Sequence, residues 1–544
     1  MARTALARWF MRLAHDLHLS RRSGRPLESL RDDHDRARES DRANGTLSRR
    51  RVLAGAGAAA TVGALSGRAS IARATTGRTV AIVGGGIAGL ACALDLADRG
   101  IASTVYEASG RVGGRMFSNT TTFPGLVSEW GGELIDSGHT TVQDLATRFG
   151  LELDDLLAAE PTGSNDTYFF FGWYYSKADA VRDFRAIFPA VEADLDAAGY
   201  PTTYDAFTAA GASLSAMTVR QWIESRVPGG IGSPLGALLD VAYAEEYAAD
   251  TTDQSALNLL YLLAFQPTRR GFSIYGESDE AFHIRGGNQL LPRAIADALG
   301  PAVRTGHRLL DIRRTSGGRV QLAFERGSSV VDVIADHAVL ALPFAVLRDF
   351  DLRRAGFDAL KLEAINDLGR GVSSKIQLQF ARRLWNERGP WPRSNGASYT
   401  DVGSYQGSWD ASRAQPGTRG LGVFFAGGTL AATKRTRTAF ATVSASGARR
   451  DVRDTLEAAE QVFPGLSALY EDRATLSLWH YSDLAKLSYA YYRPGQYTRF
   501  GGYEAARQGN VYFAGEHTSI DFQGYMEGGA STGQRAANQV ARRL

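Results

Sequence analysis

The chain has 544 residues, of which 44% are hydrophobic and 22% charged, enough for a substantial core and more than one domain. Its formal charge of +3 comes from residues 1–74, which carry 15 Lys/Arg and 7 Asp/Glu; the rest is weakly acidic, which disfavours nucleic-acid binding. The single cysteine, Cys92, excludes an intramolecular disulfide, a four-cysteine zinc site and a Cys-X-X-Cys centre, and the nine histidines show no metal-ligand spacing.

The first 74 residues predict an export signal. The segment Ser48–Leu53 reads SRRRVL and leads into an Ala/Gly-rich, weakly apolar stretch that is too short and too glycine-rich for a membrane span. The triplet Ala72-Arg73-Ala74 supplies a small-x-small cleavage site. We expect recognition by the twin-arginine translocation machinery, a secreted or periplasmic location, and no stable membrane insertion after cleavage. The alternative is a basic N-terminal arm with a flexible linker.

Residues 78–108 predict the first βαβ unit of a dinucleotide-binding fold. The expected elements are a buried strand at 79–83, a helix at 91–97 and a second strand at 103–106. Between the first strand and the helix lies a G-x-G-x-x-G motif made by Gly84, Gly86 and Gly89, whose glycines permit a tight turn, close approach of a pyrophosphate and helix packing. Glu107 follows the second strand, where a carboxylate binds an adenosine ribose.

The next residues distinguish FAD from NAD. From Glu107 to Arg115 the chain reads EASGRVGGR, which resembles the flavin-containing amine oxidase family, the monoamine oxidase and L-amino-acid oxidase group of FAD enzymes. This resemblance implies that the backbone of Gly113 and Gly114 runs beside the pyrophosphate, that Ala108 belongs to the cofactor site, and that Arg115 lies near the phosphates or the flavin.

The resemblance extends from about residue 79 to residue 544 and implies further FAD contacts. They fall in EWGGELID at 129–136, in a strand at 308–312, and in the C-terminal motifs AGEHTS and GYMEGG, where a helix start faces the flavin. The implied contact residues are Gly131, Gly132, Leu309, Gly515, Glu516, Gly524, Tyr525 and Met526.

Lys375 is the candidate catalytic residue. Its segment, LGRGVSSKIQLQF, is similar to the strand that carries the family's active-site lysine, which holds a water against flavin N5. The alternative is a lysine at a strand start with its ammonium group in solvent.

The resemblance also implies a substrate pocket. Its candidate residues are Glu133, Ser488, Tyr489 and Tyr525. Leu487 stands where monoamine oxidases attach the flavin through a cysteine, so we expect non-covalent FAD. Leu134 stands where amino-acid oxidases of the snake-venom type have a carboxylate-binding arginine, which leaves Arg269 or Arg270 as candidates for that role.

The expected fold is α/β: a glutathione-reductase-like FAD-binding Rossmann domain with an α+β substrate-binding domain made of a mixed sheet plus a helical insertion. The FAD domain is expected to comprise residues 75–160, 280–345 and 500–544, and the substrate domain residues 161–279 and 346–499. Spacing predicts helices in 195–264 and strands in 370–450. The aromatic run at 168–175 predicts a buried strand pair. Three acids, Glu245, Glu246 and Asp250, are interpreted as a solvated helix face; the alternative is that they offer charge to a cationic substrate.

The family resemblance implies an oxidase. We expect oxidative deamination of an L-amino acid by hydride transfer to flavin N5, with O2 as acceptor and a keto acid, ammonia and hydrogen peroxide as products. The alternative substrate is a primary amine or polyamine. A more distant alternative is a non-catalytic, exported flavin-binding protein. A homodimer is the expected assembly.

Overall fold

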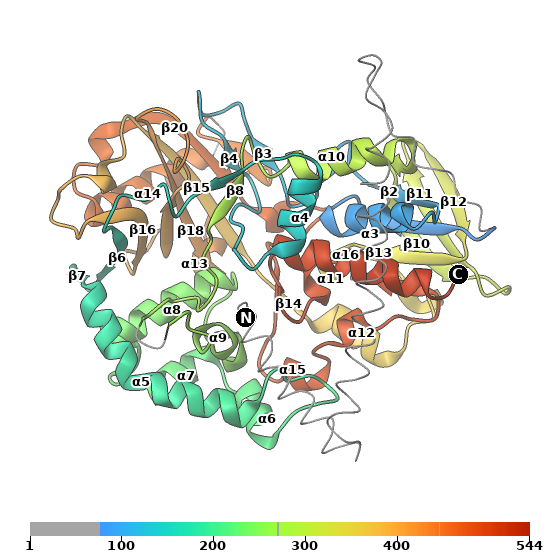
Figure 1. Ribbon diagram of the computed structural model, residues 1–544, viewed down its shortest axis with the longest axis horizontal. Coiled ribbons are helices and arrows are strands. Elements are labelled where there is room, and N and C mark those ends of the chain that lie inside the picture. The colour runs from blue at the N-terminus through green and yellow to red at the C-terminus, as the bar shows by residue number, and fades with distance from the viewer. Residues whose placement is uncertain (1–76, 269–270, 445–446) are drawn as a thin grey trace, which may run out of the picture. The chain divides into compact units, whose positions relative to one another are not determined.

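A parallel five-stranded sheet surrounds the dinucleotide motif in the computed structural model, which describes residues 77–268, 271–444 and 447–544 (Figure 1). The strand order is β22 (Val511–Phe513), β13 (His337–Leu340), β1 (Val80–Val83), β2 (Ser103–Tyr106) and β9 (Val303–Arg304). All neighbouring pairs are parallel. Each of these strands lies inside one of the three segments expected to build the FAD domain. The predicted export signal and Arg269 and Arg270 lie outside the described residues.

Helix α3 (Ile87–Asp98) follows β1 and packs against the C-terminal helix α16 (Met526–Ala541), drawn in blue and red in Figure 1. Glycines allow the close approach, because a Cβ on Gly533 would overlap the backbone of α3. A Cβ on Gly89 would likewise overlap the carbonyl oxygen of the turn after β1, which is the helix packing role predicted for the third motif glycine. Cys92 is fully buried in α3.

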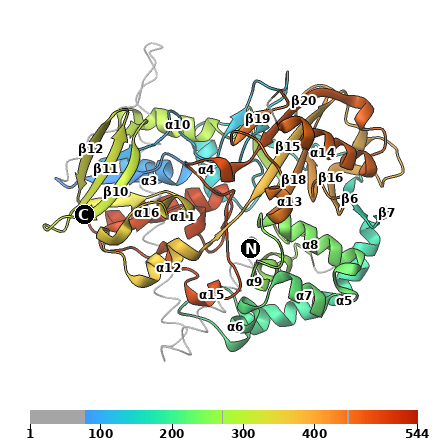
Figure 2. The same ribbon diagram turned by 180° about the vertical axis from the view of Figure 1, so that it is seen from behind.

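A second, eight-stranded mixed sheet lies apart from the parallel sheet (Figure 2). Its order is β19 (Phe440–Thr442), β20 (Tyr470–Ser477), β15 (Ser373–Phe380), β18 (Gly420–Gly427), β17 (Gly407–Asp410), β16 (Ser394–Thr400), β6 (Asn165–Phe170) and β7 (Trp173–Tyr175). Only β16 and β6 pair in parallel; the other neighbours are antiparallel. The aromatic run at 168–175 forms the predicted strand pair, the β6–β7 hairpin; Tyr168, Phe169, Phe170 and Tyr175 are buried, whereas Phe171 and Trp173 at the turn are exposed.

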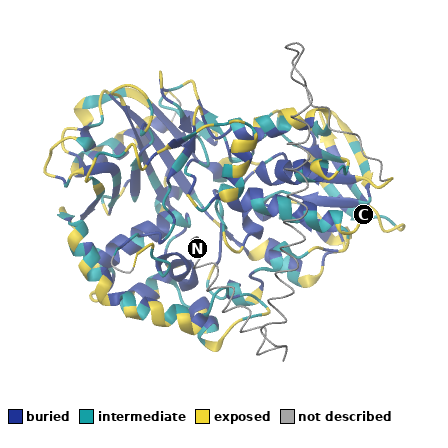
Figure 3. Cartoon of the chain, in the orientation of Figure 1, coloured by how far each residue is buried: buried dark blue, intermediate teal, exposed yellow. Residues whose placement is uncertain are grey.

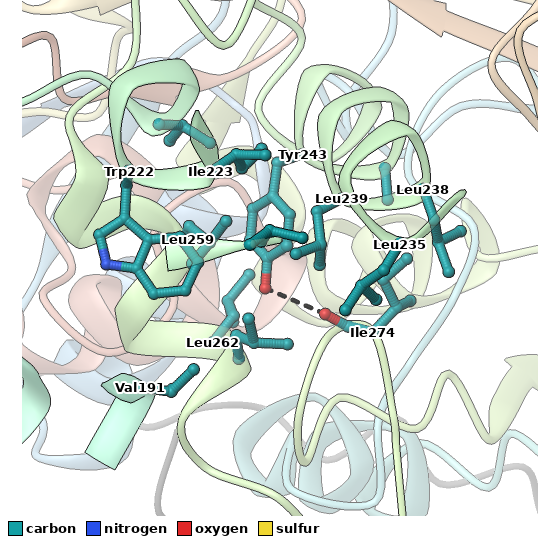
Figure 4. Close-up of a cluster of buried hydrophobic side chains, with 14 of the residues drawn as sticks. Val191, Trp222, Ile223, Leu235, Leu238, Leu239, Tyr243, Leu259, Leu262 and Ile274 are labelled. Atoms are coloured by element: carbon teal, nitrogen blue, oxygen red, sulfur yellow. Dashed lines mark hydrogen bonds between the residues drawn. The ribbon is translucent and has the colours of Figure 1, made fainter. Parts of the chain in front are cut away.

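A helical group lies beside this sheet in both ribbon views (Figure 1, Figure 2). It consists of α5 (Lys177–Ala198), α6 (Ala209–Ala216), α7 (Val219–Arg226), α8 (Pro234–Glu246) and α9 (Ala256–Leu263), so the helical prediction for 195–264 is confirmed. Figure 4 shows the core of the group, where Trp222 and several leucines surround Tyr243. The Tyr243 hydroxyl donates to the Ile274 carbonyl at 3.0 Å, which satisfies the polar atom of a fully buried ring.

The remaining elements lie outside the two large sheets and the helical group. A three-stranded antiparallel sheet is made by β10 (Arg308–Arg314), β11 (Val320–Arg326) and β12 (Ser329–Ala335). The shorter elements are β3 (Ser118–Asn119), β4 (Ser128–Glu129), α4 (Thr140–Arg148), β5 (Leu153–Asp155), β8 (Phe282–Ile284), α10 (Leu290–Leu299), α11 (Phe344–Leu347), α12 (Ala359–Asp367), β14 (Gly369–Arg370), α13 (Gly428–Ala432), α14 (Ala448–Val462), β21 (Ala490–Tyr491) and α15 (Gln496–Arg499). Burial follows the strands and the facing sides of the helices (Figure 3). The α/β fold with a parallel nucleotide-binding sheet and a mixed second sheet is confirmed.

Within the described ranges, no helix is both long and apolar enough to cross a membrane.

Candidate active site

One cavity of about 740 Å³ runs from the dinucleotide turn to the mixed sheet and the helical group. Its walls include the turn after β1, the start of α16, strands β15 and β17, and the end of α8. Residues far apart in the sequence therefore share one enclosed space. A cavity of this size is in the range of ligand and cofactor sites.

The nucleotide end of the cavity is built from backbone. Gly84 adopts φ +107°, which a residue with a side chain rarely adopts. Gly86 faces Gly114 across the turn, and a Cβ on Gly114 would come within 3.3 Å of the Gly86 Cα. The carboxylate of Glu107 accepts from the backbone N–H groups of Gly85 at 2.7 Å and Ser109 at 2.8 Å. This side-chain-free channel beside a helix N-terminus suits a pyrophosphate.

Arg115 connects the nucleotide end to the C-terminal motif. Its Nη1 donates to Oε1 of Glu516 at 2.9 Å and to the carbonyl oxygen of Ser488 at 2.8 Å. The other carboxylate oxygen of Glu516 accepts from the N–H of Gly524 at 2.9 Å. Glu516 therefore fixes both the arginine and the turn that leads into α16.

His517 is a buried residue of the cavity wall whose two ring nitrogens lack hydrogen-bond partners among the described residues. Its exposed fraction is 1%. Burial, together with nearby Arg115, Lys361 and Arg535, holds the pKa of His517 well below its usual range, so the ring is neutral with one donor and one acceptor. A buried imidazole with neither nitrogen satisfied, next to an open glycine channel, fits a cofactor rich in polar atoms, as FAD is.

Lys375 lies on β15 at the middle of the cavity. Its Nζ donates to Oε2 of Glu133 at 2.5 Å and to the carbonyl oxygen of Gly131 at 3.1 Å. The Nζ lies 5.4 Å from the centre of the Trp409 ring, and Trp409 Nε1 donates to Oε1 of Glu133 at 2.9 Å. Lys375 is buried rather than solvated, so the alternative of a strand-start lysine in solvent is wrong.

Glu133 stays charged despite its burial. Burial raises the pKa of its carboxyl, but the Lys375 ammonium and the hydrogen bonds from Lys375 and Trp409 outweigh burial, so the net shift is downward. Glu133 and Lys375 therefore form a buried ion pair, and Trp409 contacts both residues. Gly132 packs against Met526, the first residue of α16, so this pair lies next to the helix start expected to face the flavin.

Ser488, Tyr489 and Tyr525 all line the same cavity. The hydroxyl of Ser488 accepts from the N–H of Ser373 at 2.9 Å and is bonded to the Ser373 hydroxyl at 2.7 Å, which ties its loop to the strand of Lys375. The Tyr489 hydroxyl donates to the carbonyl oxygen of Glu245 at 2.9 Å. The two tyrosines thus connect the pocket to the end of α8.

The interpretation of Glu245, Glu246 and Asp250 as a solvated helix face is wrong. Glu245 is 8% exposed and Glu246 half-buried, and both line the cavity. Helix α8 is buried on nearly every side, so its last two residues turn into the cavity instead of into solvent. Asp250 lies outside the cavity lining and accepts hydrogen bonds from Thr429.

The cavity gathers most of the residues predicted for the site. Those that line it are Gly84, Gly86, Glu107, Gly113, Gly114, Arg115, Gly131, Gly132, Glu133, Lys375, Ser488, Tyr489, Gly515, Glu516, Gly524, Tyr525 and Met526. Gly89, Ala108 and Leu309 do not. Gly89 lies under the turn, and Leu309 is buried in β10, where it pairs with Phe324.

Sequence reasoning missed Trp409, His517 and, on the far wall, Glu280. His517 had a visible signal, because it directly follows Glu516 in a motif already assigned to the cofactor. The acids of α8 also had one, since an acid pair ending an otherwise apolar helix has no solvated face to occupy. Trp409 had none, because its role depends on strand pairing. In the described chain, no cluster of three His, Cys, Asp or Glu side chains is arranged to hold a metal ion.

The comparison with protein families identifies one match. The model of the family described as "Flavin containing amine oxidoreductase" matches residues 87–541, which is most of the chain.

Relatives and solved structures agree with that match. An L-amino-acid oxidase of Siganus canaliculatus is 24% identical over 491 residues, which cover 86% of this chain and 85% of that protein. Polyamine oxidase 2 of Arabidopsis thaliana is 29% identical over 277 residues, covering 49% of this chain and 51% of that one. Cyclohexylamine oxidase from Brevibacterium oxydans IH-35A superimposes with a TM-score of 0.71 at 22% identity, over 86% of this chain and 99% of that one. Putrescine oxidase bound to putrescine gives a TM-score of 0.70 at 18% identity, with the same coverage.

Proposed function

We propose that the substrate of this protein is an amine without a carboxylate. The premise is that the chain belongs to the flavin-containing amine oxidoreductase family and is an FAD-dependent amine or amino-acid oxidase. The observation that carries this proposal is the charge of the cavity beyond Lys375. An α-carboxylate buried there needs a cationic partner, and an amine needs a carboxylate or aromatic partner.

The basic side chains of the substrate region already have acidic partners. Lys375 pairs with Glu133, and Arg413 Nη1 lies 2.7 Å from Glu160 Oε1. Lys177 lies 3.7 Å from an Asp166 carboxylate oxygen. These pairs leave no cation of the described wall available for a substrate carboxylate without breaking an ion pair.

Two acids of the same wall, Glu245 and Glu280, lack a paired cation among the described residues, although, against the larger effect of burial, the charge of Arg413 lowers the pKa of Glu280 to a small extent. In the part of the chain that the structure describes, neither Glu245 nor Glu280 forms an ion pair. Leu134, at the position where snake-venom-type amino-acid oxidases have an arginine, adds an apolar contact and no charge. The balance of charge therefore favours a cationic amine.

When bound, FAD would supply the two-electron oxidant for the carbon next to the reacting nitrogen, which must first lose its proton so that hydride loss gives an iminium. The chain supplies the surroundings of that carbon. Glu133 and the Gly131 carbonyl occupy two of the three N–H donors of Lys375, which leaves the third for a water or the substrate. Tyr489, Tyr525 and Trp409 provide aromatic walls that orient the amine and exclude bulk water.

Anaerobic mixing of the FAD-loaded protein with single substrates tests this proposal. We expect simple amines and diamines to bleach the oxidised flavin absorbance and to produce peroxide when oxygen is admitted. Oxidation of neutral L-amino acids in preference to all amines would contradict the amine assignment. Failure of every amine and amino acid to bleach the flavin would support the non-catalytic alternative instead.

An L-amino acid is the second candidate substrate, and the sequence relatives favour it, since several of them are named L-amino-acid oxidase. In that case the carboxylate partner is expected at Arg269 or Arg270, which precede by three and two residues the cavity-lining segment that starts at Phe272. Replacement of both arginines by alanine then raises the KM for L-amino acids strongly and leaves the KM for amines almost unchanged.

We also propose twin-arginine export and non-covalent FAD. For export, replacing Arg50 and Arg51 by lysine is expected to retain the protein in the cytoplasm of an expressing bacterium, measured by fractionation. For the cofactor, acid precipitation is expected to release all the flavin into the supernatant, because the only cysteine is buried in α3 away from the cavity. Flavin that stays with the pellet would contradict this.

A further inference from the structure

The far wall of the cavity carries a group of carboxylates that the proposed reaction does not use. Glu245 and Glu246 end helix α8, and Glu280 lies just before β8; all three line the cavity. We call these three residues the carboxylate pocket. Glu245 is 8% exposed, and its Oε2 has no hydrogen-bond partner. A buried, unsatisfied carboxylate oxygen at a cavity wall lacks the group it needs.

The three acids oppose one another electrostatically. Burial raises the pKa of Glu245 well above its usual range, and the charges of Glu280 and Glu246 raise it further. Burial, followed by the charges of Asp136 and Glu246, raises the pKa of Glu280 to about 8. A cation in the carboxylate pocket would oppose the mutual repulsion of the three acids, and its binding would be accompanied by release of a proton from a carboxyl group.

The position of Glu245 is built into the sheet. A Cβ on Gly407, the first residue of β17, would overlap the Glu245 carboxylate, so only glycine leaves room for it. Trp409 lies two residues further along the same strand and therefore on the same face, about 7 Å away along the strand. Trp409 contacts the Glu133–Lys375 pair. Strand β17 thus contacts the carboxylate pocket at Gly407 and the Glu133–Lys375 pair at Trp409.

Tyrosine side chains of the cavity wall lie beside the acids of the carboxylate pocket. The Tyr525 hydroxyl donates to Oε1 of Glu246 at 2.5 Å, and Tyr525 is the residue before helix α16. Tyr275 and Tyr399 also line the cavity, and the charge of Glu245 raises the pKa of each, after burial has raised it more. Ring faces beside carboxylates favour an alkylammonium group, whose methylene chain and charge are both accommodated.

We propose that the carboxylate pocket binds a second ammonium group of the substrate, so that the preferred substrates are diamines or polyamines oxidised at one nitrogen and anchored at another. This inference rests on the proposed amine oxidase function and deepens it.

Matched substrate pairs test the inference. The FAD-loaded protein is mixed anaerobically with putrescine and with n-butylamine, then with cadaverine and with n-pentylamine, and the rate constant of flavin reduction divided by the apparent Kd is compared within each pair. Each pair differs only in the distal ammonium. We expect the diamine to be favoured about tenfold or more, since a charge-assisted hydrogen bond is worth a factor of that order.

Isosteric variants locate the effect. Glu245→Gln and Glu280→Gln remove charge with little change in shape and are expected to bring the diamine-to-monoamine ratio close to one. Gly407→Ala, which crowds the Glu245 carboxylate, is expected to lower the ratio as well. The matched control is Glu192→Gln on the exposed side of α5, which leaves the ratio unchanged. FAD content and Tm of each variant establish that it is folded.

The outcomes separate the two proposals. Flavin reduction by monoamines as effective as by diamines, or a ratio that survives both glutamate variants, overturns the carboxylate pocket assignment while the amine oxidase function stands. Oxidation of L-lysine in strong preference to cadaverine overturns the proposed function instead, because a substrate carboxylate is then recognised. Absence of flavin reduction with every amine overturns the proposed function, and this inference with it.

Discussion

Removing the charge of Glu133 is predicted to destabilise the protein through Lys375. The side chains of Lys375 and Glu133 are only 5% and 8% exposed, so neither charge is solvated once its partner is lost. Glu133→Gln keeps the shape and the acceptor for Trp409 but leaves the ammonium with only the Gly131 carbonyl. Loss of one partner of a buried ion pair costs about 3–5 kcal/mol. We expect a value near the lower limit, since the lysine can lose its proton.

Thermal unfolding of the FAD-loaded protein at neutral pH measures this effect. Glu133→Gln and Lys375→Met are each expected to lower Tm by several degrees, whereas the double variant recovers much of the loss because no unpaired charge remains. The control is Glu152→Gln, which removes an exposed ion pair with Arg285 and is expected to change Tm little. A double variant as unstable as the sum of the singles would refute the buried-pair argument.

The remaining predictions concern the cofactor, the pH dependence and the lysine's aromatic neighbour. Gly86→Val should fold but retain less than about a tenth of the bound FAD, measured by absorbance. A Cβ at Gly86 would lie 3.9 Å from the Gly114 Cα with no other atom as near, so the valine side chain fills the channel. The control is Gly110→Ala, which has open space around its Cβ and should retain FAD. The pKa of Glu280 is raised to about 8 in the folded protein, so between about pH 4.5 and pH 8 the folded state holds a proton on Glu280 that the unfolded state has lost. The free energy of unfolding should therefore decrease as the pH rises across that window. Glu280→Gln should reduce this decrease, measured as Tm against pH. Trp409→Phe removes a hydrogen bond from Glu133 and should lower the rate constant of flavin reduction more than it raises the apparent Kd, as stopped-flow measurements can separate; an equal change in both would contradict a positioning role.

The nucleotide-binding half could be predicted from the sequence because its signals are local. The glycines of the turn after β1 are required by backbone geometry, and Glu107 follows at a spacing fixed by one strand and one helix. Lys375 was found through a motif around it, although its own residue type favours solvent. These features need no knowledge of which strands pair.

The substrate half could not be predicted in the same way, because its residues meet only through long-range pairing. Glu245 from α8 meets Gly407 from β17, and Trp409 meets Glu133 from a loop of the other layer. The misreading of Glu245 and Glu246 has a specific cause: acids at a helix end are usually solvated, but here the helix is buried on nearly every side against the mixed sheet, α7 and α5. Tertiary burial, not local pattern, decides their environment.

The central claim is that the cavity around Lys375 brings a cationic amine to bound FAD. Anaerobic titration of the FAD-loaded protein with putrescine, followed through the flavin absorbance, tests it most directly. Full bleaching of the oxidised flavin band by putrescine, with no comparable bleaching by L-leucine, is the predicted result. An absorbance unchanged by putrescine and by the other amines, in a protein that binds FAD and is folded, would contradict the account.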